Sequence, residues 1–114
     1  MVPTLAFDAV YGRELSFLGE TMLPPDEGCG IGSSDVGNVS QVIPTIQPTI
    51  RITDRPTPWH SEESKAAARS EKGLASIALG AKALALTALD LIADPALLRQ
   101  IKADHARAIM EQQE

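Results

Sequence analysis

Residues 71–93 read EKGLASIALGAKALALTALDLIA, and this stretch decides the fold. Apolar residues recur in it at intervals of three and four, which is the period of an α-helix. They are Leu74, Ile77, Ala81, Leu84, Ala88 and Leu91, and Leu79, Ala83, Leu86 and Leu89 widen the same face. Only a narrow strip is polar, so the sequence predicts a helix that is apolar over most of its circumference. Such a helix must be covered on more than one side.

The flanking sequence predicts two further helices. Asp94-Pro95 begins one of them, with Asp94 as the N-cap and Pro95 at the first helical position. One amphipathic face of this terminal helix is formed by Leu97, Leu98, Ile101, His105 and Ile109. Near the start of the chain, residues 3–19 have apolar residues at helical spacing, and Gly19 suits the end of a helix.

The segment between these helices is rich in β-branched residues and is interrupted by Pro44 and Pro48. It predicts two short strands, Val39–Ile43 and Thr49–Thr53, with the prolines at strand ends, where no ladder donor is needed. The predicted fold class is therefore α/β, with short strands packed on the long Ala/Leu-rich helix and on the terminal helix. Two short strands are marginal by themselves. We expect the chain either to form oligomers or to be a piece of something larger.

Composition limits the classes of partner. The 114 residues include 15 acidic and 10 basic side chains, for a net charge of −5, which argues against binding to nucleic acid. A single cysteine, Cys29, suggests a reducing compartment, and the residues after Met1 have no basic and apolar regions of the secretory type, so we expect no secretory signal. The apolar stretch 74–93 is mostly alanine and contains Lys82 and Asp90, which we interpret as too weak for a membrane span. We therefore expect a cytoplasmic chain with no membrane or nucleic-acid partner.

The two histidines differ in their surroundings. His105 fits a partly exposed residue of the terminal helix. His60 follows Pro-Thr-Pro-Trp and precedes Ser61-Glu-Glu, which is a typical helix start with Ser61 as the N-cap. That is a position where α/β folds place site residues, although position alone favours a structural histidine. The chain contains no HxxxH, HxH, HxD or CxxC spacing that would indicate a metal site by itself.

A glycine-rich loop, Gly30-Ile-Gly-Ser-Ser-Asp35, invites comparison with phosphate-binding loops. It lacks the lysine of a P-loop and does not match the dinucleotide-binding pattern. A tight turn is the ordinary interpretation, and an anion bound by backbone N–H groups is the alternative. Cys29 beside it is interpreted as a loop thiol rather than as a nucleophile, because no histidine adjoins it in the sequence.

Three separated motifs, in order, resemble the C-terminal segment of the metal-dependent amidohydrolases. Residues 32–45, GSSDVGNVSQVIPT, form the first motif, and His60-Ser61-Glu62-Glu63 is similar to the His-Ser/Thr-x-x motif that follows in the family. Residues 83–91 and 94–98 are similar to parts of the last two helices of the family. The family includes p-aminobenzoyl-glutamate hydrolase, aminoacylase-like proteins and glutamate carboxypeptidases. The resemblance extends over residues 3–108.

The resemblance implies a chemistry and a set of site residues. In the family two divalent metals, zinc or in some members manganese or cobalt, bridge a water that a glutamate base activates against an amide carbonyl. His60 is implied as the last metal ligand. Gly32, Ser33, Ser34 and Asp35 are implied as the loop that holds the substrate near the metals. The implied substrate is a small amide, such as an N-acyl amino acid or an aminobenzoyl-glutamate-like molecule.

The same resemblance implies that most of the site lies elsewhere. In the family the other ligands and the catalytic glutamate come from the N-terminal half of the catalytic domain, and a dimerisation domain is inserted between that half and this segment. We therefore expect residues 1–114 to be a partial catalytic domain with no catalytic residue of its own, inactive without that half. Two alternatives stay open: a small subunit that completes a partner's active site, and a non-catalytic helical interaction module.

Overall fold

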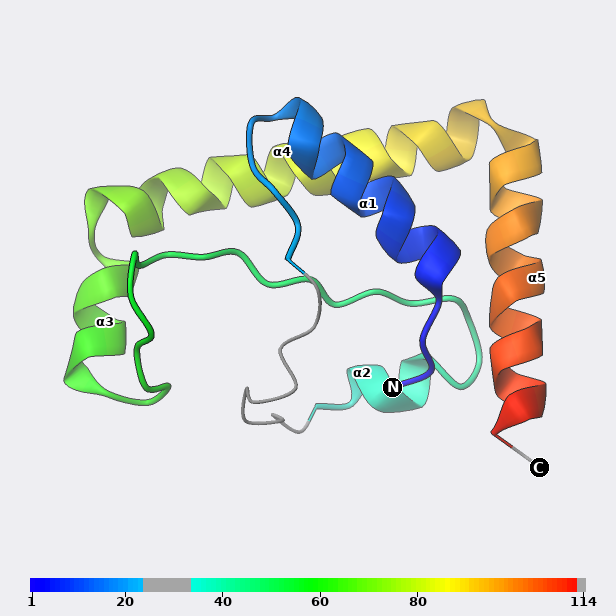
Figure 1. Cartoon of the computed structure of the whole chain (residues 1–114), viewed down its shortest axis with the longest axis horizontal. Helices are drawn as coiled ribbons and strands as arrows, with labels where there is room; N and C mark the ends of the chain where they lie inside the picture. Colours follow the sequence, from blue (N-terminus) through cyan, green and yellow to red (C-terminus); the bar gives the residue numbers. More distant parts are fainter. Residues whose placement is uncertain (24–33, 113–114) are drawn as a thin grey trace.

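The computed structural model describes residues 1–23 and 34–112, and within them the chain is helical. The helices are α1 (Leu5–Phe17), α2 (Val36–Val39), α3 (Glu62–Ala68), α4 (Glu71–Ala93) and α5 (Pro95–Glu111). Figure 1 shows α4 as the longest element, with α1 crossing its middle, α5 turning away from its C-terminal end and α3 beneath its N-terminal end. Helix α4 contacts α1, α3 and α5, and α1 also contacts α5.

Local capping explains where the helices begin. The Asp94 side chain accepts hydrogen bonds from the backbone N–H groups of Ala96 and Leu97, at 3.0 and 3.2 Å, and Pro95 occupies the first turn of α5. Ser70 caps α4 in the same way by accepting from the Gly73 N–H at 3.0 Å. The predicted long helix and the predicted start of the terminal helix are both confirmed.

The N-terminal helix is also confirmed, with slightly shorter bounds. It ends at Phe17, and Gly19 follows with a φ of 91°, a left-handed conformation that glycine adopts without strain. The Gly19 N–H donates to the Ser16 carbonyl at 3.0 Å, which is one of the bonds that satisfy the last carbonyls of the helix.

The core lies where α1 crosses α4. Tyr11 and Leu15 of α1 and Ala83 of α4 are buried there. Four partly buried side chains pack around them: Leu18, Met22, Ile46 and Leu79. This is a small core for a chain of this length, and it leaves most of the surface of α4 uncovered.

The predicted strands are wrong for the described residues, in which no strand forms. Val36–Val39 forms the short helix α2, and the following turn is closed by bonds from the Val42 and Ile43 N–H groups to the Val39 carbonyl, at 3.0 and 3.1 Å. Thr49–Thr53 runs along α4 without a strand beside it (Figure 1). A β-branched segment becomes a strand only when a neighbour accepts and donates its backbone hydrogen bonds, and the described part of this chain supplies none. The architecture is therefore helical rather than α/β.

His105 is buried rather than partly exposed, which corrects the sequence expectation. Its side chain is 7% exposed, and its Nε2–H donates to the Ser40 carbonyl at 2.7 Å. The Ser40 hydroxyl oxygen in turn accepts from the Val2 N–H at 2.9 Å. These bonds join α5, the turn after α2 and the N-terminus, so His105 has a structural role that its place on the helix did not reveal.

As expected from the sequence, the described residues leave much of the apolar surface of α4 exposed. Its exposed large apolar side chains are Leu74, Ile77, Leu84, Leu89 and Ile92, and the last of these is 79% exposed. By length and composition α4 is sufficient to cross a membrane, with a mean hydropathy of 1.6 over its best window, so alanine content alone does not make it too weak. Only 11% of this apolar stretch is buried, whereas a core helix of a soluble protein with the same length and composition would be mostly buried.

Candidate functional site

His60 occupies a strained turn at the start of α3. Its φ of 56° is the only positive value among the non-glycine residues that the structure describes. The turn is held by Ser61, whose hydroxyl donates to the Pro58 carbonyl at 2.6 Å and accepts from the Ser64 N–H at 3.1 Å. The left-handed region is unfavourable for residues with a side chain, although histidine adopts it more readily than most. Such strain persists where the surroundings enforce it, and it is common at functional sites.

The imidazole of His60 is exposed and makes no hydrogen bond to any other residue of the described ranges. Of the two acids that follow it, Glu62 forms an ion pair with Lys65 at 3.2 Å across the surface of α3. No group of three or more His, Cys, Asp or Glu side chains is assembled for a metal within residues 1–23 and 34–112. Zinc sites take at least three protein ligands. His60 alone cannot make such a site, and its assignment as a metal ligand stays a prediction.

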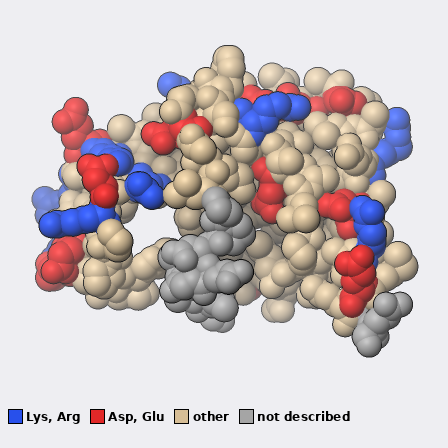
Figure 2. Space-filling model, in the orientation of Figure 1, with Lys and Arg blue, Asp and Glu red and all other residues tan. Residues whose placement is uncertain are grey.

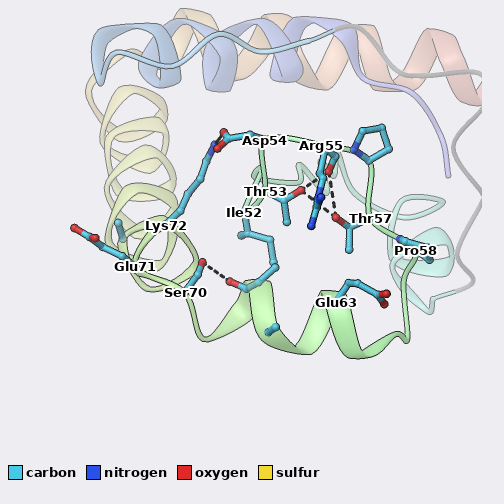
Figure 3. A pocket seen from close by; sticks show the side chains of 14 residues that line it. Ile52, Thr53, Asp54, Arg55, Thr57, Pro58, Glu63, Ser70, Glu71 and Lys72 are labelled. Atoms are coloured by element: carbon cyan, nitrogen blue, oxygen red, sulfur yellow. Dashed lines mark hydrogen bonds and ion pairs between the residues drawn. The ribbon is translucent and has the colours of Figure 1, made fainter.

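An open groove of ≈ 1260 Å³ lies beside this turn, between the 52–58 segment, α3 and the start of α4. Figure 3 shows the side chains of Arg55 and Glu63 projecting into this space from opposite walls. The hydroxyls of Thr53 and Thr57 both donate to the Arg55 carbonyl, the second at 3.1 Å, so they are used within the loop. The groove is therefore lined by charges of both signs, Arg55, Glu63 and Glu71 together with the paired Asp54 and Lys72. The sequence has no motif that predicts the proximity of Arg55 and Glu63, because the fold of the 52–58 segment brings them together.

The groove wall is closed by an ion pair between Asp54 and Lys72 of α4. The hydrogen bond from the Lys72 ammonium, together with its positive charge, lowers the pKa of the Asp54 carboxyl below its ordinary value. Figure 2 shows acidic and basic side chains gathered together at this end of the molecule, around α3. Both partners face solvent, and such an exposed pair contributes little to stability.

The predicted substrate loop is only partly described. Gly32 and Ser33 lie outside the described residues, as do Cys29 and Gly30. Ser34 accepts from the Val36 N–H at 3.3 Å and donates to Gln47 Oε1 at 3.4 Å.

Asp35 precedes α2 as its N-cap residue, but its exposed side chain makes no capping bond. In Figure 1, which looks down the shortest axis, α2 lies well apart from α3. The chain by itself therefore does not bring Ser34 and Asp35 next to His60, and their assignment to one site stays a prediction.

Comparison with known proteins identifies relatives of longer length. Over 82 residues the chain is 42% identical to the human protein Xaa-Arg dipeptidase, a match that covers 72% of this chain and 19% of the relative. A mouse Xaa-Arg dipeptidase is 42% identical over 83 residues, with the same coverage. No family model and no solved structure matches the chain. The chain spans about a fifth of the length of these relatives, and the matches support a relationship to hydrolases of a peptidase family without identifying the subfamily.

Proposed function

We propose that this chain is the C-terminal segment of a metal-dependent amidohydrolase or peptidase, and that His60 is its contribution to the metal site. The observation that carries the proposal is the exposed imidazole of His60 on a strained, hydrogen-bonded turn. The similarity to Xaa-Arg dipeptidases supports the same class of protein. Their name favours a dipeptide as the amide substrate, beside the N-acyl amino acids and aminobenzoyl-glutamate-like molecules of the wider family.

Residues next to His60 fix the position of its imidazole. The Ser61 hydroxyl donates to the Pro58 carbonyl and accepts from the Ser64 N–H. These two hydrogen bonds hold the backbone of the turn that carries the His60 imidazole. A neutral imidazole donates a ring-nitrogen lone pair to a divalent ion. Two divalent ions, zinc or manganese or cobalt, would polarise the amide carbonyl and activate a water when bound. The remaining ligands and the base belong to the other four fifths of such a protein, and Ser34 and Asp35 would hold the substrate.

The interaction-module alternative is favoured by one observation, the uncovered apolar surface of α4. A helix with this much exposed apolar area indicates that something covers it in the complete assembly. The same surface is expected of a small subunit or of a segment taken from a larger domain. Only a test of His60 separates a metal-binding segment from a non-catalytic module.

The test replaces the matched segment of human Xaa-Arg dipeptidase with this chain. We expect the chimera to bind metal and to hydrolyse a dipeptide. His60→Ala in it should lower metal occupancy, measured by elemental analysis, and reduce kcat by more than about 100-fold, because a metal supplies several kcal/mol of transition-state stabilisation. Trp59→Phe changes the exposed neighbour and is the matched control, which should retain both properties. Full metal occupancy and activity in the His60→Ala chimera would disprove the assignment.

A further inference from the structure

Helix α2 follows Ser34 and Asp35, and it has little packing of its own to hold it in place. It is a single turn with no buried residue, and it packs against none of the other described helices. A one-turn helix is unstable by itself, because fixing the first turn costs more free energy than its hydrogen bonds return. The position of α2, and of the two residues before it, therefore depends on contacts at its ends.

The contacts at the C-terminal end of α2 meet at Ser40, which is completely buried. Its N–H donates to the Val36 carbonyl at 2.9 Å, and its hydroxyl donates to the Gly37 carbonyl at 2.6 Å. The hydroxyl oxygen also accepts from the Val2 N–H at 2.9 Å, and the Ser40 carbonyl accepts from His105 Nε2–H at 2.7 Å. Ser40 is thus held by two bonds within the turn and by two bonds from distant segments.

His105 is the one side-chain donor among these partners of Ser40, and it stands on a well-anchored helix. Helix α5 contacts both α1 and α4. Ile101, one turn before His105, is buried, and the neighbouring Asp104 carboxylate accepts from the Ala6 N–H of α1 at 3.0 Å. The imidazole therefore connects the position of α5 to the end of α2.

The hydrogen bonds of α2 connect Ser40 to the two residues of the predicted substrate loop that the structure describes. The Asp35 carbonyl accepts from the N–H groups of Asn38 and Val39, at 2.9 and 3.2 Å. The Ser34 hydroxyl oxygen accepts from the first N–H of α2 at 3.3 Å. A shift of Ser40 would therefore move Ser34 and Asp35 with it.

We infer that His105 is a positioning residue, which sets the place of Ser34 and Asp35 by holding the Ser40 carbonyl. The inference rests on the proposed function, in which these two residues hold the substrate. Removal of the imidazole would leave a buried carbonyl without a donor, and such a group is costly enough for the turn to move toward water. The metal ligand His60 would stay in place, because its turn is held by separate bonds and α3 lies well apart from α2 (Figure 1).

The first test uses amide hydrogen exchange on the full chain by itself. His105→Leu removes the donor but retains an apolar side chain, His105→Gln retains a side-chain N–H, and Lys102→Leu places leucine at an exposed position of the same helix. We expect His105→Leu to reduce the protection of the Val39 and Ser40 N–H groups about tenfold or more, with no such loss at the core of α1. His105→Gln should restore most of this protection, and Lys102→Leu should retain it.

Two exchange results would overturn the inference. One is unchanged protection of the Ser40 N–H in His105→Leu. The other is an equal loss of protection around Ser40 and in the core of α1, because that would show a general loss of stability and no local control of α2.

The second test measures kinetics in the chimera of human Xaa-Arg dipeptidase described above. His105→Leu should raise KM for a dipeptide about tenfold and leave kcat within about twofold, because it disturbs substrate binding and not the metal. His105→Gln should restore KM, and Lys102→Leu should retain both constants. A residue that only stabilised the fold would reduce the amount of active enzyme, so a lower kcat with an unchanged KM would overturn the inference.

The two tests separate this inference from the proposed function. Hydrogen exchange on the chain requires neither metal nor substrate, so it decides whether His105 positions α2 even if the chimera binds no metal and the proposed function is wrong. A chimera whose activity depends on His60, but whose KM is unchanged in His105→Leu, would leave the proposed function standing and the inference wrong.

Discussion

Gly73 lies in the first turn of α4, close to the end of α3, and replacing it tests how α3 and the His60 turn before it are positioned. Gly73 is buried in the first turn of α4, and its N–H donates to the capping hydroxyl of Ser70. A side-chain carbon added there would lie 2.8 Å from the carbonyl oxygen of Ala68 and nearer still to that of Ala67. Both oxygens belong to the backbone at the end of α3, so no flexible side chain can move aside.

The magnitude of the effect follows from two opposed terms. Overpacking a well-packed site costs about 1–3 kcal/mol. Alanine in place of glycine within a helix returns up to about 1 kcal/mol. Because both clashing oxygens are backbone atoms, the cost lies at the upper end of that range, at about 2–3 kcal/mol. Gly73→Ala should therefore lower the free energy of unfolding by about 1–2 kcal/mol, which corresponds to a fall in Tm of roughly 4–8 °C for a chain of this size.

The assay is thermal and urea unfolding of the purified chain, with Gly37→Ala as the matched control. Nothing lies within 4 Å of a side-chain carbon at Gly37, so that variant should stay within about 0.5 kcal/mol of the parent. In the dipeptidase chimera, Gly73→Ala should also weaken metal binding without any change to His60, because α3 must shift. A Gly73→Ala chain as stable as the parent would refute the close seating of α3 on α4.

Three further predictions concern single side chains. Ser61→Ala should destabilise the chain by about 1 kcal/mol in urea unfolding, because it removes the N-cap of α3, whereas an unchanged midpoint would deny the cap. The hydrogen bond from the Ala6 N–H lowers the pKa of Asp104 below its ordinary value, so Asp104→Asn should lower Tm at pH 7. The difference in Tm between the variant and the parent should shrink as the pH falls through that lowered pKa, and a difference independent of pH would contradict this. Ile92→Ser should leave the unfolding midpoint of the isolated chain unchanged, since that side chain is exposed; a large loss would show that Ile92 is covered.

Local signals in the sequence predicted the helices well. An N-cap depends on one side chain and the next three backbone N–H groups, so Asp94 and Ser61 mark their helix starts without knowledge of the fold. The apolar period of residues 71–93 likewise predicted both α4 and its incomplete cover. These features are determined within a few residues of the chain.

Features that depend on distant partners were not predictable in the same way. The β-branched residues of 39–53 predicted strands, but a strand also requires a second strand, and the turn bonds after α2 formed instead. His105 is buried because Ser40, 65 residues away, presents its carbonyl to the ring, and nothing near His105 in the sequence indicates that contact. For the site, sequence resemblance selected His60, and the structure added the strained turn that holds it.

The central claim is that His60 binds a metal, and a crystal structure of the zinc-loaded chimera tests it most directly. Anomalous diffraction at the zinc edge locates the metal independently of any assumption about the ligands. The account predicts a zinc ion about 2.0–2.1 Å from a ring nitrogen of His60, with the other ligands supplied by the dipeptidase part. A zinc ion held entirely by other residues, with the His60 imidazole facing solvent, would contradict it.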